Sequence, residues 1–375
     1  MPLHLPEARF AGIALSREWI ADATQVSCAT EDLDALLLAA DRPENLFGML
    51  IAATRLDLPT VCLPPPGTPL RAAVMAMGLA PVSGDPTPVA VGLGANQGPR
   101  PVNLLENFSL ANGLRAGVAA GGGPEILVHL AALAREVGVT GFPQMIRVLA
   151  PETPATELAW TRENGAPALL ASLGDTLHDV PTVAGPLKRN LAPAPKAPEH
   201  RRLVFARARA SGAEVVCQAP VGVSEISGEC RVYGSQDEAV GAVKADQVPD
   251  GSVVVVNGCG PRGGGLLRLD ALGAALLEAD VRASVLTDGL PPENAPGASW
   301  ATLFAPEAAM GGVTGRLRDG DPIRLDLEGG RILAEIGAGE LRDREPFEAT
   351  GRPGYGYAAR YTRSALAALE GAGFG

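Results

Sequence analysis

The chain has 375 residues, of which 46% are hydrophobic and 19% are charged, so it is long enough for two globular domains. Its net charge of −11 disfavours a nucleic-acid partner, because phosphate binding needs a clustered basic surface. No uncharged apolar run of about 18 residues predicts a membrane span, and the N-terminus lacks the pattern of a signal peptide. Five scattered cysteines without a CxxC pair predict a cytoplasmic protein without disulfides.

The first part of the chain predicts a strand–helix–strand unit. A helix is expected over residues 16–26, because the Ser16 hydroxyl suits the position before its first turn. Short apolar strands are expected at 34–40 and 59–63, with a helix over 45–56 between them. This order predicts a parallel pair of strands with a crossover helix.

Helices dominate the next hundred residues. They are expected at 72–80, 106–120, 124–139 and 166–173, with loops rich in proline and glycine between them. His129 lies beside the apolar face of the third of these helices. Because no partner for a metal or a proton transfer is evident, we interpret it as a core residue rather than a ligand.

A proline-rich segment predicts a linker at residues 186–201, and it separates an N-terminal domain (1–185) from a C-terminal domain (202–375). The second domain is β-rich and is expected to close on a short helix at 362–372. Its expected strands cover residues 202–208, 213–219, 230–235, 252–257, 282–288 and parts of 313–336.

Two turns are expected within the last of these segments. Asp319-Gly320-Asp321 and Glu328-Gly329-Gly330 have the composition of hairpin turns between alternating strands. The two aspartates are interpreted as solvated turn carboxylates rather than as a metal site.

The stretch at residues 252–267 combines a run of valines, a glycine-rich turn and the start of a helix. A turn of this kind brings the backbone close to a bound group at the ligand edge of an α/β domain. Residues 258–263 fit G-x-G-x-x-G, but Pro261 removes a backbone N–H that a pyrophosphate would need, and Asp280 precedes its strand instead of ending it. A dinucleotide site is therefore disfavoured.

Two residues near this turn have open interpretations. Cys259 precedes a helix, which can lower the pKa of a thiol, but a buried and unreactive thiol is the favoured interpretation. Asp288-Gly289 follows an apolar strand and is either a site at the end of that strand or a turn. With only four histidines in the chain, no Ser/His/Asp arrangement is recognisable.

Several stretches together resemble the family of dihydroxy-acid dehydratases, phosphogluconate dehydratases and sugar-acid dehydratases. The resemblance implies an α/β fold with an N-terminal parallel-sheet α/β domain, a C-terminal β-barrel-like domain, an active site between them and a dimeric assembly. It also implies hydro-lyases that use an iron–sulfur cluster on three cysteines, a Mg²⁺ ion on carboxylates and a carbamylated lysine, and a serine base. The matching stretches occur in family order at 16–22, 47–59, 121–139, 233–243, 260–265, 286–289, 305–312 and 319–327.

The residues that carry this chemistry are replaced. Arg42-Pro43-Glu44 stands where the family's Cys-Asp-Lys motif is expected, and the loop at Pro64–Leu70 holds no third cysteine. Cys259 replaces a metal-binding glutamate, and Pro292 replaces the serine base. The segment with the family's first cysteine and an aspartate ligand has no counterpart here. We therefore expect neither an iron–sulfur cluster nor Mg²⁺.

These departures predict a catalytically degenerate homologue that keeps the scaffold, the homodimer and a pocket for a small carboxylic acid. Arg262 is the expected donor to that acid, because its guanidinium fork matches a carboxylate. The alternative is an active lyase with a site rebuilt around Cys259, Arg262 and Asp288. Under either hypothesis, the candidate catalytic residues are Cys259, Asp288 and Glu293, and the candidate substrate-binding residues are Arg262, Gly263, Gly264 and Gly289.

Overall fold

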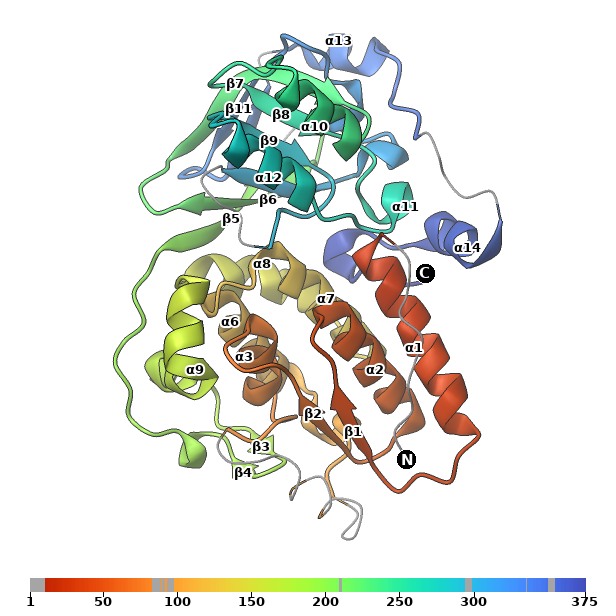
Figure 1. Ribbon diagram of the computed structural model, residues 1–375, viewed down its shortest axis with the longest axis vertical. Helices are drawn as coiled ribbons and strands as arrows, with labels where there is room; N and C mark the ends of the chain where they lie inside the picture. Colours follow the sequence, from red (N-terminus) through yellow and green to blue (C-terminus); the bar gives the residue numbers. More distant parts are fainter. Residues whose placement is uncertain are drawn as a thin grey trace. The chain divides into compact units, whose positions relative to one another are not determined.

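The computed structural model describes residues 11–82, 89, 92, 98–208, 211–293, 299–334, 336–349 and 355–375 (Figure 1). The expectations for the first ten residues and for most of the loop at 83–97 lie outside these ranges. The chain divides into two compact units. One contains Ser16–Arg201, and the other contains Arg202–Gly375 together with a short segment that ends at Leu15.

The first unit contains the predicted strand–helix–strand arrangement. Strands β1 (Leu36–Ala39) and β2 (Thr60–Leu63) pair in parallel, and α2 (Pro43–Leu56) connects them. Helix α1 (Ile13–Ala29) precedes this unit in the chain and begins three residues before the predicted start at Ser16. The prediction of a parallel pair with a crossover helix is confirmed.

The remainder of the first unit is mainly helical. Its α7 helix packs against α2 and α6, and α6 packs against α3. Glycines on α6 permit this close approach, since a Cβ at Gly113 would lie 2.5 Å from Met77 Cγ and one at Gly117 would lie 2.6 Å from Ile126 Cγ1. The helices are α3 (Pro69–Ala76), α5 (Pro101–Leu104), α6 (Asn107–Ala119), α7 (Gly123–Glu136), α8 (Phe142–Glu152) and α9 (Leu158–Leu173).

Two of these helices differ from the prediction. Helix α8 was not expected at all, because Pro143 and Pro151 break its apolar pattern although Pro143 suits the first turn. Helix α9 begins at Leu158 rather than at Ala166, and its backbone kinks at Gly165, where φ is 82°. Because the helix changes direction at Gly165, its two halves do not share one apolar periodicity, and the sequence pattern therefore did not predict the first half.

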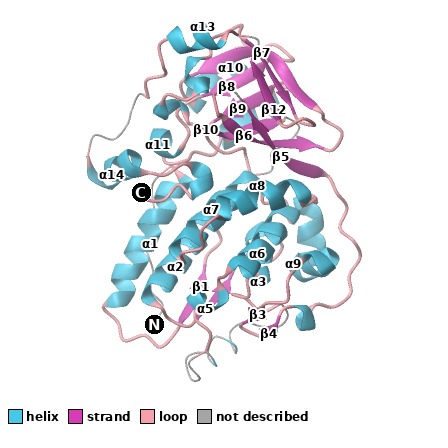
Figure 2. Ribbon diagram, turned by 180° about the vertical axis from the view of Figure 1, so that it is seen from behind, coloured by secondary structure: helices cyan, strands magenta, loops and turns pink. Residues whose placement is uncertain are grey.

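The second unit is built on a closed eight-stranded barrel in the order β10-β6-β5-β12-β11-β7-β8-β9 (Figure 2). Its centre is parallel, from β7 through β8 and β9 to β10, and the flanking pairs β11–β7 and β10–β6 are antiparallel. The strands are β5 (Arg201–Arg207), β6 (Glu214–Pro220), β7 (Glu225–Tyr233), β8 (Val253–Val256), β9 (Ser284–Thr287), β10 (Trp300–Ala305), β11 (Pro322–Asp326) and β12 (Arg331–Ala334).

The valine run forms β8 and is buried on both faces. Val253 and Val255 belong to the cluster in the barrel that includes Leu286 and Ala301. Val254 and Val256 belong instead to the cluster formed with α10 (Gln236–Lys244) and α12 (Asp270–Glu278). Alternating side chains on a covered strand explain why four β-branched residues stand in succession here.

The last hundred residues contain three corrections. Strand β10 was not predicted, and it places Trp300 in the core. Asp319–Asp321 is not a hairpin turn, because a short 3₁₀ turn at Val313–Arg316 precedes it and β11 pairs with β7 and β12. The turn at Glu328–Gly330 does connect the β11–β12 hairpin, as predicted.

The third correction concerns the tail. Helix α14 (Gly356–Ser364) ends before most of the predicted helix begins, and a 3₁₀ turn at Ala368–Glu370 follows it. A short helix, α13 (Ala338–Asp343), also precedes it. Within the described ranges, no helix is long and apolar enough to cross a membrane.

Candidate functional site

The glycine-rich turn after β8 folds back on itself. Gly258 and Gly265 have φ values of 78° and 79°, which favour glycine, and Pro261 begins the short helix α11 (Pro261–Gly264). A Cβ on Gly263 would lie 2.4 Å from the carbonyl oxygen of Gly258. The turn therefore depends on glycine for its geometry, and it directs several backbone N–H groups to one side.

The first group that these N–H groups bind is the carboxylate of Asp288, which follows β9 and is 1% exposed. Asp288 Oδ1 accepts a hydrogen bond from the N–H of Cys259 at 2.8 Å. Oδ2 accepts from the N–H groups of Gly258 and Ala308 at 3.3 and 3.1 Å. Asp288 thus connects the turn to the segment that follows β10, and its carboxylate is shielded from solvent.

The second group is the carboxylate of Glu307. Its two oxygens accept from the N–H of Arg262 at 3.0 Å each, and Oε2 also accepts from the N–H of Gly263 at 3.2 Å. The same carboxylate fills the space beside Gly260, where a side chain would collide with it. The groups that approach the glycine-rich backbone are therefore two acids of the chain itself.

Burial changes the pKa values of both carboxyl groups. It raises the pKa of Asp288 to about 6, although the hydrogen bonds from backbone N–H groups oppose this rise. Burial first, and the nearby charge of Asp288 second, raise the pKa of Glu307 to about 7. Both groups can therefore exchange a proton near neutral pH, which is a property shared by general acids and bases.

Cys259 lies beside Asp288, whose carboxylate its backbone N–H binds, but that acid does not activate the thiol. The residue is 1% exposed and belongs to the cluster between the barrel and its outer helices. Burial, and then the charge of Asp288, raise the pKa of the thiol above its ordinary value. Its Sγ lies 3.8 Å from the carbonyl oxygen of Asn257, to which it donates. The thiolate is therefore disfavoured, in contrast to the thiol of a nucleophilic cysteine.

Three other candidate residues, Arg262, Gly264 and Gly289, lie in the turn or in contact with it. Arg262 lies at the turn, and its Nε donates to the carbonyl oxygen of Ala365 at 2.7 Å. The N–H of Gly289 donates to Thr287 Oγ1 at 3.0 Å, and a Cβ on Gly289 would lie 2.6 Å from Cys259 Cβ. Gly264 belongs to α11 in the same turn.

Glu293 is the remaining candidate residue. It is exposed, and its backbone N–H donates to Asp270 Oδ1, at the start of α12, at 3.1 Å. Glu307 was not singled out from the sequence. The stretch 305–312 carries part of the family resemblance, so its acidic residue was a detectable signal.

In the first unit, Arg42-Pro43-Glu44 opens α2. Glu44 is 1% exposed and forms an ion pair with Arg42, and its Oε2 has no hydrogen-bond partner in the described part of the chain. This position therefore holds a structural acid at the start of a helix, where a negative charge is favoured.

His129 is a core residue, as predicted, but it has partners. Its ring stacks on Phe47 with centroids 5.0 Å apart, and its nitrogens lie 3.3 Å from Glu125 Oε1 and 3.5 Å from an Arg17 guanidinium nitrogen. Burial lowers the pKa of His129, although the hydrogen bond with Glu125 opposes this effect. The ring is thus held in place on several sides.

The residues present do not fit a three-cysteine cluster or a Mg²⁺ site. All five cysteines are buried and free, and they lie on α1, β2, β6, β7 and the turn after β8. No group of three or more His, Cys, Asp or Glu residues in the described ranges is arranged to hold a metal ion. The Asp288–Glu307 pair instead has its oxygens directed at backbone N–H groups.

Comparison with known proteins identifies relatives of this chain. Residues 208–372 match the family described as dihydroxy-acid/6-phosphogluconate dehydratase C-terminal. A dihydroxy-acid dehydratase of Citrifermentans bemidjiense is 29% identical over 363 residues, which cover 88% of this chain and 64% of that relative. Those of Methanoregula boonei and Sulfurisphaera tokodaii are 30% and 29% identical over 72% and 73% of this chain and 54% and 55% of their own.

The chain thus spans 64% of the length of the first of these relatives. The similarity extends beyond the barrel unit, because 88% of the chain is aligned. The chain is a divergent member of the dihydroxy-acid/6-phosphogluconate dehydratase family, and its barrel unit carries that family's C-terminal domain.

Proposed function

We propose that this protein keeps the scaffold of the dehydratases without their dehydration chemistry. In this proposal it does not dehydrate 2,3-dihydroxy carboxylic acids or sugar acids, and it acts as a homodimer that binds a small carboxylic acid. It contains neither an iron–sulfur cluster nor Mg²⁺.

The observation that carries the proposal is the packing of Pro292. Pro292 stands where the resemblance places the serine base, and it is buried against α12, where a Cβ on Gly273 would lie 2.4 Å from Pro292 Cγ. A proline side chain has no group that can take or give a proton. The position that abstracts a proton in the active relatives is therefore part of a helix contact here.

The state of the neighbouring residues supports the same conclusion. The Cys259 thiol is buried with a raised pKa, and the carboxylates of Asp288 and Glu307 accept hydrogen bonds from the backbone of their own unit. Arg262 remains a candidate for binding a carboxylate, because the side-chain hydrogen bond that it makes among the described residues, to the Ala365 carbonyl group, uses Nε and leaves the two terminal nitrogens for a ligand. Binding without proton abstraction is the chemistry that these residues favour.

The alternative is an active lyase with a site rebuilt around Cys259, Arg262 and Asp288. One observation favours it: the pKa values of Asp288 and Glu307, raised to about 6 and about 7, suit proton transfer at neutral pH. In such an enzyme the acids, not the thiol, would move the proton.

The decisive experiment offers the purified protein iron, sulfide and Mg²⁺ under anaerobic conditions and then a panel of dihydroxy and sugar acids. A dihydroxy-acid dehydratase treated in the same way is the positive control. We expect no stoichiometric iron or sulfide and no 2-keto acid product. A brown protein with bound iron and sulfide, or turnover of any panel member, would contradict the proposal.

Binding is tested separately by calorimetry with small carboxylic acids and with the neutral amides as controls. Arg262→Gln is expected to weaken binding by about 10- to 150-fold, because a charge-assisted hydrogen bond is worth about 1.5–3 kcal/mol. The matched control is Arg282→Gln, since Arg282 is exposed on the same unit and lies outside the turn. Turnover that disappears in Asp288→Asn or in Glu307→Gln, while Arg262→Gln leaves every affinity unchanged, would favour the rebuilt lyase.

The homodimer is an expectation from the relatives' assembly and is tested by light scattering. We expect twice the monomer mass of 38.4 kDa at micromolar concentration. The monomer mass under these conditions would remove this part of the proposal and leave the others standing.

A further inference from the structure

A cavity in the second unit is separate from the turn that holds Asp288 and Glu307. Its volume is about 690 Å³, and neither acid nor any residue of the turn at 257–265 lines it. Pockets of roughly 300–1,000 Å³ are the size that enclose small organic ligands. We refer to it as the barrel pocket, because Ala213, Ile332 and Leu333 on or beside the barrel strands form part of its wall.

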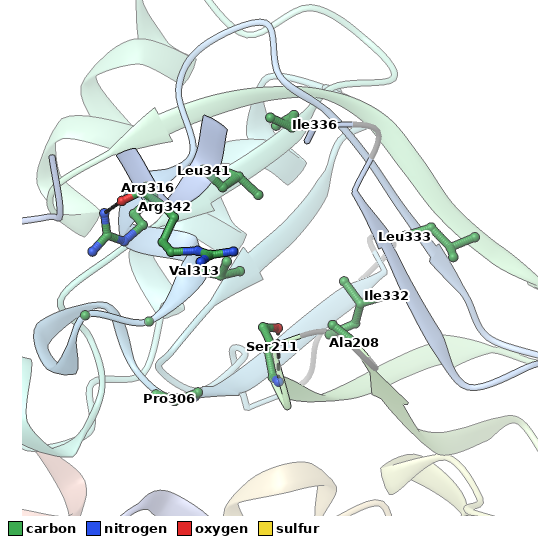
Figure 3. A pocket seen from close by; sticks show the side chains of 13 residues that line it. Ala208, Ser211, Pro306, Val313, Arg316, Ile332, Leu333, Ile336, Leu341 and Arg342 are labelled. Atoms are coloured by element: carbon green, nitrogen blue, oxygen red, sulfur yellow. Dashed lines mark hydrogen bonds between the residues drawn. The ribbon is translucent and has the colours of Figure 1, made fainter. Parts of the chain in front are cut away.

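The wall of the barrel pocket is apolar on one side. Ile332 lies on this side in the close view and Ile336 lies above it, whereas Leu341 lies close to Arg316 and the side chain of Leu333 points away from the arginines (Figure 3). Ile336 is only partly buried, against the hydrophobic cluster of the barrel that includes Ile332. Such an apolar surface is stabilised when a hydrocarbon group covers it.

The opposite side of the pocket carries positive charge. Arg316 and Arg342 lie together there, next to Val313 (Figure 3). Arg316 is held in place, because its NH1 donates to the carbonyl oxygen of Arg342 at 2.9 Å and also to that of Arg344. Its remaining N–H groups and the exposed guanidinium of Arg342 are thus positioned at one edge of an apolar cavity.

These two charges are not balanced by acids in the wall. No aspartate or glutamate is among the described residues that line the pocket, although the chain has 42 acidic residues and 31 basic ones. The neighbouring Arg344 differs, because its guanidinium binds Asp321 at 3.1 Å and Glu340 at 2.7 Å. Among the described residues that line the pocket, Arg316 and Arg342 thus have no carboxylate partner, whereas Arg344 has two.

We propose that the barrel pocket binds a medium-chain saturated monocarboxylate, with the carboxylate at Arg316 and Arg342 and the hydrocarbon chain along Ile332 and Ile336. A guanidinium pair and an aliphatic wall in one cavity recognise the two ends of such a molecule. A short hydrophilic acid lacks the chain that covers the wall, and a neutral hydrocarbon lacks the charge. This site is independent of the carboxylic acid site proposed at Arg262.

The test is calorimetric titration of the full-length protein with hexanoate, octanoate and decanoate, kept below their micelle concentrations. Each added CH₂ that is buried contributes about 0.8 kcal/mol, so the dissociation constant should fall about fourfold per CH₂ until the pocket is full. Arg342→Gln should weaken octanoate binding by at least about 10-fold. It should leave binding of 1-octanol, which has no charge, unchanged.

The matched control is Arg282→Gln, an exposed arginine of the same unit that does not line the pocket. A second variant, Ile336→Ser, changes the apolar wall and should reduce the dependence on chain length while sparing the need for the carboxylate. Circular dichroism melting confirms that each variant is folded. Equal weakening by Arg282→Gln, binding without saturation, or an affinity that ignores chain length in the wild type would each overturn the proposal.

Discussion

Asp288 and Glu307 are held by the same turn, from N–H groups only three residues apart in sequence: Cys259 binds the first acid, and Arg262 binds the second. Burial raises the pKa of both carboxyl groups, and the charge of Asp288 raises that of Glu307 further, although the charge of Arg262 opposes this effect. This relationship makes the proton equilibria of the turn sensitive to pH near neutrality.

The first prediction concerns stability as a function of pH. A carboxyl group whose pKa is raised on folding stabilises the folded state fully below its unfolded pKa of about 4. That contribution is lost as the pH rises through about 6 for Asp288 and about 7 for Glu307. Between pH 5 and 8 the free energy of unfolding should fall by about 1 kcal/mol through Asp288 and about 2.5 kcal/mol through Glu307.

Urea denaturation at several pH values measures this slope. Glu307→Gln should make the free energy of unfolding less dependent on pH between 5 and 8, whatever its effect on absolute stability. The exposed acid Asp237 on α10 provides the control variant, Asp237→Asn, which should keep the wild-type slope. An unchanged slope in Glu307→Gln would show that this acid does not titrate in the assigned range.

The second prediction concerns the glycines. Gly263→Ala should destabilise the protein by about 2 kcal/mol or more, because the new Cβ would lie 2.4 Å from a backbone oxygen that cannot move away freely. Gly241→Ala should stabilise it by about 0.5–1 kcal/mol, since Gly241 is exposed within α10 and nothing lies within 4 Å of its Cβ position. Thermal melting of the two variants gives opposite signs if the turn has the described geometry.

The third prediction is that the native thiols react slowly. All five cysteines are buried, and burial raises the pKa of Cys62 and of Cys217 to about 12. At pH 8 a disulfide reagent should therefore modify less than one thiol per chain within minutes, and five in guanidinium chloride. Rapid and selective labelling of Cys259 in the native protein would instead indicate an activated thiol and favour the rebuilt lyase.

The fourth prediction concerns the buried arginine of α1. Arg17 is fully buried, and its guanidinium binds Glu18 Oε1 at 2.9 and 3.0 Å. Arg17→Met should destabilise the protein by about 3–5 kcal/mol, because it leaves a buried charge without its partner. Arg324→Ala is the comparison. Its ion pair with Glu225 is partly exposed and should contribute no more than about 1 kcal/mol in denaturant titrations.

The parallel strand pair and the buried valine strand were predictable because each rests on a local pattern. Four valines in succession indicate a strand covered on both faces, and β8 is such a strand. Strand β10 gave no comparable pattern, since its burial comes from pairing with β6 and β9, which are distant in sequence. The tail helix was misplaced because Ala365 is extended and is held by a bridge to Phe374.

The site was predictable only in part for the same reason. Cys259, Arg262 and Gly263 lie in one continuous turn, and Asp288 follows a strand adjacent to β8, so their proximity follows from the order of the chain. Glu293 follows Asp288 by only five residues, but the chain turns toward α12 and leaves that side chain exposed. Glu307 reaches the turn only because the barrel brings the end of β10 beside it, which no local pattern encodes.

The two acids at the turn also constrain which side chains position 259 can hold. A glutamate at position 259 would add a third carboxylate beside Asp288, in a position that is now 1% exposed. Such a substitution is expected to lower stability, because a buried charge without a partner is costly. The turn therefore accepts a small uncharged side chain at this position and disfavours an acidic one, unless a positive charge is introduced beside it.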